Sequence, residues 1–363
     1  MVLHPLLPVC ALAMSIGLAG AVDTSAPPQA GDPTLGRILV HALTTHHIAG
    51  MGIAVVRSSG VQAIAVAGWR KAGDPTAVTV QDQWHIGSCT KMMTAALVAR
   101  LVEQGRLHWD TPLIGLLAPG TPCDAAWRNI TIDHLLCHRA GLAANLDWGH
   151  LPRRATVLAT IAGSAPPLPV GDFAYSNTGY VTIGACCELL GGRTWEQLIA
   201  DQVWHPLGIT QAGFGGMGLP GQVDQPWGHH PDGTPAGNGP AADNPAVMGP
   251  AGTVHIPLAD WARFIADQMC GARGQAGLLA TASYQHLQQA WPGGDYARGW
   301  GVTERAWAKG PAYTHSGSNT MHYAVVWMAP AVDLAVLVTA NRGEAGPACD
   351  EAVAAAIAAF LKH

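Results

Sequence analysis

The sequence predicts an α/β fold that carries a mostly helical insertion. Strand-like apolar runs occur near both ends of the 363-residue chain, and helical segments separated by loops rich in Pro and Gly occupy its middle. Sheet at both ends with helices between them is typical of an α/β domain with an insertion. We expect the α/β part at about 30–95 and 250–363, and the helical insertion at about 96–249.

The leading residues predict a secretory signal. They are apolar and end in Ala19-Gly20-Ala21, a small-residue cleavage pattern. We therefore expect a signal peptide over 1–21, a mature domain over 22–363, and a periplasmic or secreted location. The leader contains no Lys or Arg, which leaves an uncleaved anchor open as an alternative, although Pro5 and Pro8 disfavour its helix.

The elements after the leader follow from hydrophobic periodicity. A helical pattern covers 33–45, and two strand-like runs, 51–57 and 61–69, are joined by a turn that contains Gly60. An apolar helix is expected from Ser88 to about Gln104. The helical region follows, and its Gly/Pro/Asn/Asp-rich stretch 228–245 is long enough to suggest a functional loop. Strands are then expected at 298–303, 313–316, 323–329 and 334–340, with a closing helix at 351–362.

Composition favours a compact exported enzyme or binding protein. Hydrophobic residues make up 49% of the chain and charged residues only 12%, so a large core can be buried. The formal charge is −5 and the longest basic run is Arg153-Arg154, so the Lys/Arg stripe that a nucleic-acid surface needs is missing. Once the leader is cleaved, no uninterrupted apolar run of about 18 residues remains, so no stable membrane span is expected.

The eight cysteines do not make a disulfide framework. Loss of Cys10 with the leader would leave an odd, scattered set, and most of its members are expected to be small core residues. One bridge, such as Cys123–Cys137, stays open.

Ser88 and Lys91 are the first residues whose spacing suggests chemistry. Three positions apart at a helix start, they share one helical face. A Ser hydroxyl is a weak nucleophile until a base takes its proton, and a Lys amine serves as that base when burial lowers its pKa. Ser88 would also have the helix N-terminus beside it to stabilise an oxyanion.

The spacing alone is weak evidence, because Ser-x-x-Lys should occur by chance about once in a chain of this length. A surface Lys beside a helix-capping Ser is the structural alternative. The chain has only four lysines, however, and Lys91 is the one inside an apolar helix, where a charge needs a reason.

Two further segments carry suitable side chains. Tyr175-Ser176-Asn177 alone indicates a turn with an aromatic anchor, and His315-Ser316-Gly317 alone indicates an edge strand. In this order after Ser88 and Lys91, they resemble the active site of the serine β-lactamase and penicillin-binding-protein superfamily. The resemblance is to the branch related to class C β-lactamases, which uses Tyr-x-Asn.

Three other segments support this resemblance, which covers roughly residues 33 to 362. They are Ile130–Leu142, similar to the family stretch ITIRHLLTHTSGL, Pro250–Trp261, similar to AGGL-STA-DLA, and Arg298–Gly301, similar to YGLGW. The resemblance implies a β-lactamase/transpeptidase-like fold, in which an antiparallel sheet is flanked by helices and the site lies between the sheet and the helical insertion.

The resemblance also implies the catalytic roles. Ser88 is the nucleophile that becomes acylated. Lys91 and Tyr175 form the base pair, in which Tyr175 is deprotonated or relays a proton to the leaving group, and Tyr175 later activates the deacylating water. No cofactor is implied.

Substrate binding is assigned in the same way. Asn177 would bind Lys91 and the substrate's acyl side chain. His315, Ser316 and Gly317 would form the substrate-binding strand, and the backbone N–H groups of Ser88 and Ser318 would form the oxyanion hole.

The chain departs from the family where His315 replaces the Lys of Lys-Thr-Gly. A His is largely neutral at pH 7, whereas Lys is charged and helps to hold the carboxylate of β-lactams. A free His protonates near pH 6.5, so we expect lowering the pH through that value to improve KM selectively for carboxylate-bearing substrates. This departure weakens the antibiotic-resistance interpretation.

We therefore expect a serine hydrolase that acts on a small-molecule ester, amide or peptide through an acyl-enzyme. β-Lactamase and D,D-carboxypeptidase or D-aminopeptidase activity remain alternatives. A non-catalytic penicillin-recognising sensor domain is the alternative from another class. No metal is expected: His134 and His138 have a zinc-compatible i, i+4 spacing on a helix, but the Glu of the metallopeptidase pattern is missing.

Overall fold

A computed structural model describes residues 27–117 and 120–361. The predicted signal peptide, 1–21, lies outside these ranges, so its cleavage and the predicted location stay predictions. Within them, no helix combines the length and the apolar character needed to cross a membrane.

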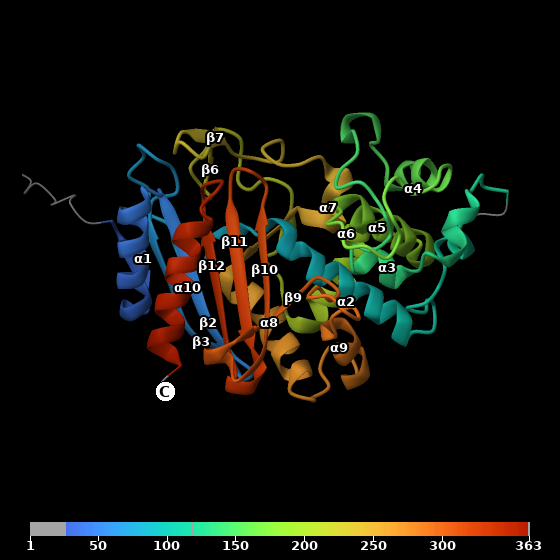
Figure 1. The fold of residues 1–363 in the computed structure, drawn as a ribbon. Helices are drawn as coiled ribbons and strands as arrows, with labels where there is room; N and C mark the ends of the chain where they lie inside the picture. Colours follow the sequence, from blue (N-terminus) through green and yellow to red (C-terminus); the bar gives the residue numbers. More distant parts are fainter. Residues whose placement is uncertain (1–26, 118–119, 362–363) are drawn as a thin grey trace, which may run out of the picture.

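The chain forms a seven-stranded sheet from its two ends, as predicted (Figure 1). Its order is β1-β3-β2-β12-β11-β10-β9, and all neighbours are antiparallel. The strands are β1 (Gln29–Gly31), β2 (Gly50–Arg57), β3 (Gly60–Gly68), β9 (Gly301–Arg305), β10 (Gly310–Ser318), β11 (Tyr323–Ala329) and β12 (Leu334–Ala340). The join between the two halves is β2 against β12, with Ile53 opposite Val338.

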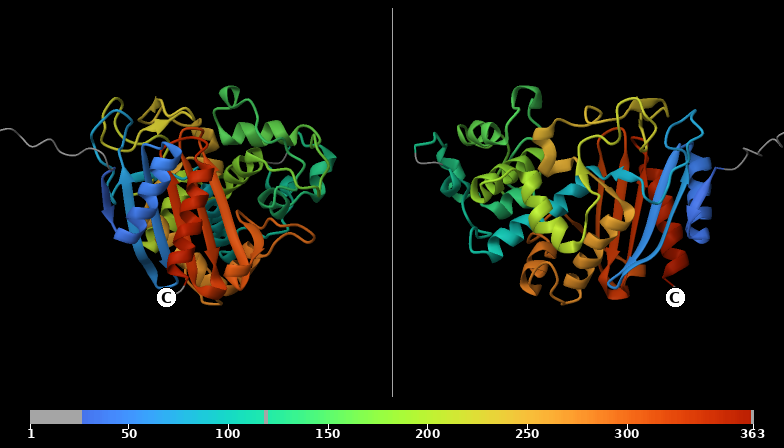
Figure 2. Two further views of the ribbon diagram at one scale, coloured as in Figure 1. Left: turned by 60° about the vertical axis from the view of Figure 1, so that its left-hand side comes forward. Right: turned by 180° about the vertical axis from the view of Figure 1, so that it is seen from behind.

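Helices cover both faces of this sheet (Figure 2). Helices α1 (Pro33–His46) and α10 (Gly346–Phe360) pack on one face around a separate apolar cluster. Helix α8 (Leu258–Ala272) packs on the other face against β2 and β3. Strands β2 and β12 are almost continuously hydrophobic and buried, because helices cover the sheet on both faces.

The helical region lies beside the sheet and surrounds helix α2 (Thr90–Glu103). Its other helices are α3 (Ile132–Leu136), α4 (Arg154–Ala162), α5 (Asn177–Gly191), α6 (Trp195–Ile199), α7 (Gly249–Gly252) and α9 (Thr281–Gln288). Two smaller sheets complete the fold: β4 (Gln83–His85), β8 (Val254–Pro257) and β5 (Gly213–Phe214), and the pair β6 (Gly228–His229) and β7 (Pro235–Gly237).

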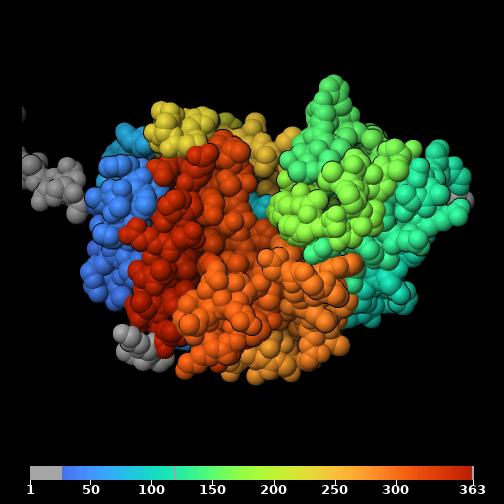
Figure 3. Space-filling view, in the orientation of Figure 1, coloured from blue at the N-terminus to red at the C-terminus, as the bar shows by residue number. Residues whose placement is uncertain are grey.

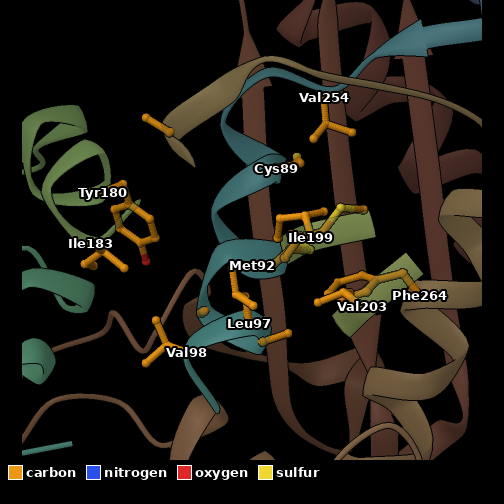
Figure 4. Close-up of a cluster of buried hydrophobic side chains, with 14 of the residues drawn as sticks. Cys89, Met92, Leu97, Val98, Tyr180, Ile183, Ile199, Val203, Val254 and Phe264 are labelled. Atoms are coloured by element: carbon orange, nitrogen blue, oxygen red, sulfur yellow. The ribbon is translucent and has the colours of Figure 1, made fainter. Parts of the chain in front are cut away.

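Helix α2 is the centre of the core. Residues 91–99 are all buried, because apolar side chains surround the helix on every side. Figure 4 shows Met92 and Leu97 of α2 among side chains from other elements, including Ile183 of α5 and Phe264 of α8. The start of α2 is therefore fixed from several directions.

Several predicted elements have different bounds. The strand expected at 313–316 is longer and spans 310–318, and the helix expected from Ser88 begins at Thr90. The strand expected at 298–303 begins only at Gly301, because Gly299 adopts a left-handed conformation and Arg298 is held by Asp133 through two hydrogen bonds. The last helix begins at Gly346, since Pro347 is tolerated in a first turn. The stretch 228–245, expected to be a loop, contains the short β6–β7 pair.

Candidate active site

Ser88 lies in a 3-10 turn, Gly87–Cys89, that leads directly into α2. The turn and the helix place Ser88 and Lys91 on one face, as their spacing predicted, and Lys91 Nζ lies 3.0 Å from Ser88 Oγ. In Figure 3 the cyan segment of the chain that leads into α2 is visible at the bottom of a hollow between the orange strands and the green helical region.

The Lys91 amine is completely buried and has three oxygen partners. Besides Ser88 Oγ, these are Asn177 Oδ1 at 2.7 Å and the Ala251 carbonyl oxygen at 2.7 Å. Among the described residues no carboxylate pairs with it. Burial therefore lowers the pKa of Lys91 to about 7, so that a large part of the population is neutral at physiological pH.

Tyr175 and Asn177 reach the same amine from the start of α5. Ser176 caps this helix by accepting a hydrogen bond from Gly179 N–H, which orients the residues on either side of it. Lys91 Nζ lies 4.9 Å from the centre of the Tyr175 ring, and the Tyr175 hydroxyl lies near Ser88. Burial of that hydroxyl raises the pKa of Tyr175 above its usual value, although 37% of the residue is exposed.

The predicted oxyanion nitrogens come together through a contact between two glycines. A Cβ atom on Gly317 would collide with the Ile86 carbonyl oxygen and the Ser88 nitrogen, and one on Gly87 would collide with the Ser318 nitrogen. Gly87 also has φ +48°, which a residue with a side chain rarely adopts. The end of β10 therefore lies directly against the turn that carries Ser88.

The side chains of Ser316 and Ser318 turn away from Ser88. Burial alternates along β10, so that His315 and Gly317 face the core while Ser316 and Ser318 face the other side. Ser316 is exposed on that other side, and Ser318 Oγ donates to the His322 carbonyl oxygen at 2.7 Å. Of the predicted binding strand, the backbone and the His315 side chain are therefore the parts that face the site.

His315 is neutral and has both ring nitrogens engaged. Its Nδ1–H donates to the Ser316 carbonyl oxygen at 2.7 Å, and the Tyr296 hydroxyl donates to Nε2 at 3.1 Å. Burial, together with the nearby Lys91, lowers the pKa of His315 to about 3. The expectation that His315 protonates near pH 6.5 is therefore wrong, because the buried ring cannot be hydrated when charged.

His138 holds the segment around Tyr175, a role that sequence reasoning missed. Its carbonyl oxygen accepts from Ala174 N–H at 2.9 Å, its Nδ1 accepts from Ser176 N–H at 3.0 Å, and its ring lies 4.3 Å from the Tyr175 ring. The only available signal was its place in the family stretch around Ile130–Leu142. The premise that His134 and His138 share a helix is wrong, since α3 ends at Leu136 and His138 has a left-handed φ of 58°.

A second unexpected group supports the turn before Ser88. His85 Nδ1 accepts from Gly87 N–H at 3.1 Å, and its Nε2 lies 2.9 Å from Asp243, which also accepts from the Asn319 amide at 3.0 Å. Burial acts to raise the pKa of Asp243, but His85 and Asn319 hold it below its usual value. Asp243 belongs to the stretch 228–245, so that stretch contributes to the site.

The cysteines and the possible metal-binding side chains of the described residues were also compared with the sequence analysis. Cys123 and Cys137 are both free thiols there, so the bridge considered from the sequence is not formed. Among these residues no group of three or more His, Cys, Asp or Glu side chains is arranged to hold a metal ion.

The fold and this site define a class of protein. An antiparallel sheet flanked by helices, with a Ser-x-x-Lys turn, a Tyr-x-Asn segment and a glycine-bearing strand around one amine, is the arrangement of the β-lactamase and penicillin-binding-protein fold. Two solved structures share the fold. A complex of SurE with D-Leu has a TM-score of 0.73 at 24% identity, covering 90% of this chain and 74% of the other. A class C β-lactamase from Rhodobacter sphaeroides has a TM-score of 0.73 at 18% identity, covering 91% and 100%.

The chain belongs to the Beta-lactamase family, whose model it matches over residues 35–360. It is 29% identical to penicillin-binding protein 4 of Amycolatopsis lactamdurans, over 83% of each chain. It is also 29% identical to an unguisins hydrolase of Aspergillus campestris, over 50% of this chain and 36% of that protein. The resemblance inferred from the sequence is thereby confirmed, and relatives of this chain are hydrolases.

Proposed function

We propose that this protein is a serine hydrolase that forms an acyl-enzyme at Ser88 and acts on a neutral carboxylic ester or small amide. The observation that carries the proposal is the set of partners around the Lys91 amine. A neutral amine has two N–H groups and one lone pair. Asn177 Oδ1 and the Ala251 carbonyl oxygen, both at 2.7 Å, can only accept, so they take the two N–H groups.

The lone pair of neutral Lys91 then faces Ser88. The Ser88 hydroxyl, 3.0 Å away, is the one partner of the amine that is able to donate a proton. Lys91 is the general base of acylation in this proposal, because its pKa of about 7 matches neutral pH while the pKa of Tyr175 is raised. Tyr175 stays protonated and relays a proton from the Ser88–Lys91 pair to the leaving group. In the second half-reaction the same two groups activate the water that hydrolyses the acyl-enzyme.

The contact between Gly87 and Gly317 supports an oxyanion hole. It brings the nitrogens of Ser88 and Ser318 to the same place beside the nucleophile. Preorganised N–H donors at a developing oxyanion typically contribute about 10²–10³-fold to kcat. Asn177, oriented by the Asn145 side chain at 3.0 Å, contacts the acyl side of the substrate in this proposal.

A neutral substrate is supported by His315. The ring carries no charge at neutral pH and has no free nitrogen with which to bind a carboxylate. Hydrolysis of an amide or peptide bond is the second candidate, and it is favoured by the similarity to an unguisins hydrolase and to a penicillin-binding protein. Both candidates use the same acyl-enzyme at Ser88.

Labelling tests the nucleophile. A fluorophosphonate or a slowly deacylating ester should add one acyl or phosphonyl group to the peptide that contains Ser88, measured by mass spectrometry of the intact and digested protein. Ser88→Ala should lose both the label and turnover without a change in thermal stability, because it removes one oxygen atom. An adduct on another residue would contradict the assignment of Ser88 as the nucleophile, and no adduct with any acylating probe would favour the non-catalytic sensor alternative.

The pH dependence tests the base. Lys91 must be neutral to accept the Ser88 proton, so kcat/KM for a neutral ester should fall as the pH is lowered through about 7 and level off above it. His315, with its pKa lowered to about 3, should contribute no step in this range. The profile of His315→Gln should therefore keep the step near 7, and its disappearance in that variant would show that His315, not Lys91, titrates there.

A pair of neighbouring substitutions tests the strand. Gly317→Ala should lower kcat by about 10²–10³-fold, because the added Cβ separates β10 from the Ser88 turn and so disrupts the oxyanion hole. Ser316→Ala is the matched control and should stay within a few-fold of wild type, since its side chain is exposed on the other side of β10. Steady-state kinetics and thermal denaturation of both variants provide the measurement. A large loss in Ser316→Ala with little loss in Gly317→Ala would contradict this arrangement.

A further inference from the structure

Exposed apolar side chains gather on the segment that leads to Tyr175. Four of the seven large hydrophobic residues that are strongly exposed in the described chain are Leu168, Val170, Phe173 and Tyr175, at 37–46% exposure. Scattered exposed hydrophobics are normal, but four of them within the eight residues that end at Tyr175 indicate a binding surface. We call these four side chains the apolar rim; they lie in segment 168–175, which also carries the exposed Asp172.

Phe173 is held in a defined position on the apolar rim. Its ring centre lies 5.7 Å from that of Tyr296 and 5.9 Å from that of His138, and both of these rings also contact Tyr175. On its outer side, the Arg139 guanidinium lies 5.8 Å from the ring and donates to the Gly171 carbonyl oxygen at 2.7 Å. Phe173 is therefore fixed although 46% of it stays exposed.

The groups between Phe173 and the reacting atoms are neutral. Burial lowers the pKa of His138 and of His315 and raises the pKa of Tyr296, so none of the three carries a charge at neutral pH. Arg139 is the cation nearest to Phe173, and it packs between Phe173 and Trp291. The surface that continues from Phe173 to Tyr175 is thus apolar and aromatic.

The chemistry decides which part of the substrate meets this surface. The group that gives a proton to the leaving atom must touch that atom, and in the proposed function this group is Tyr175. The substituent on the leaving oxygen or nitrogen therefore begins beside Tyr175, at one end of the rim. The acyl side lies by Asn177, whose amide is held by Asn145 at 3.0 Å.

We propose that the apolar rim, with Phe173 at its centre, is a subsite for an uncharged aromatic or branched aliphatic alcohol or amine that leaves during acylation. This inference rests on the proposed function and names its leaving group. An aromatic leaving group that fits such a subsite buries more apolar surface than a two-carbon chain can. We therefore expect kcat/KM to be about tenfold or more higher for the aromatic ester than for the ethyl ester.

Matched esters test the subsite. Benzyl acetate and ethyl acetate share the acyl group and have alcohols of similar acidity, so their ratio of kcat/KM reports the leaving-group subsite. Wild type should prefer benzyl acetate by about tenfold or more, Phe173→Ala should reduce the ratio by about tenfold, and Phe173→Leu should keep part of it. Leu189→Ala is the control, because Leu189 is 55% exposed but lies twelve residues, about 18 Å, along α5 from Asn177.

Two further series separate the alternatives. In a p-nitrophenyl series from acetate to octanoate only the acyl chain changes. The dependence of kcat/KM on chain length should therefore be the same in wild type and in Phe173→Ala. If wild type prefers octanoate to acetate and Phe173→Ala loses that preference, the rim binds the acyl group and the proposal is overturned. A preference for 4-carboxybenzyl over benzyl acetate would overturn it as well, because Arg139 would then be binding a carboxylate.

The failure of this inference differs from the failure of the proposed function. If Phe173→Ala leaves the benzyl-to-ethyl ratio unchanged while Ser88→Ala is inactive, the subsite is wrong and the hydrolase stands. If wild type hydrolyses none of these esters and Ser88 takes no label, the proposed function itself fails.

Discussion

The burial of one amine, that of Lys91, is the constraint on which the rest of this site depends. An ammonium ion without a carboxylate partner is costly in a protein interior, and the cost is reduced when the amine is neutral. Two oxygens that can only accept, those of Asn177 and Ala251, then orient the lone pair toward Ser88. The burial that disfavours the ammonium form of Lys91 thus provides a neutral base, and the partners of the buried amine direct its lone pair toward Ser88.

The fold supplies this environment by joining distant parts of the chain. Lys91 belongs to a helix that is buried on all sides, Asn177 begins α5 in the helical region, and Ala251 lies in α7, which packs against α2. The seven-stranded sheet, closed by β2 against β12, carries β10 to the Ser88 turn, where Gly87 and Gly317 permit direct backbone contact. Each of these elements is needed to exclude water from the amine while leaving Ser88 accessible.

Periodicity and motif order were sufficient to predict much of this arrangement. The strands at both ends, the apolar helix after Ser88 and the shared face of Ser88 and Lys91 follow from local pattern and spacing. The contact of Asn177 with Lys91 was expected only from the resemblance to the family, and the structure contains it. The turn of Ser316 away from the site could not be predicted, because a one-residue change in strand phase reverses every side chain. The protonation state of His315 could not be predicted from the sequence either, since it depends on burial and on Tyr296, nineteen residues away. His138 binds the backbone of a distant segment, and Asp243 binds the distant side chains of His85 and Asn319, which no local pattern records.

The most direct test of this account is the pKa of Lys91 itself. The chain contains only four lysines, so protein labelled with ¹³C at the lysine Cε should give four resolvable NMR signals, and Lys91→Arg assigns the one that matters. The account predicts that the Lys91 signal titrates at about 7, below the ordinary lysine value of about 10.4. A Lys91 signal that stays fully protonated up to about pH 10 would contradict the neutral-base interpretation on which the proposed mechanism rests.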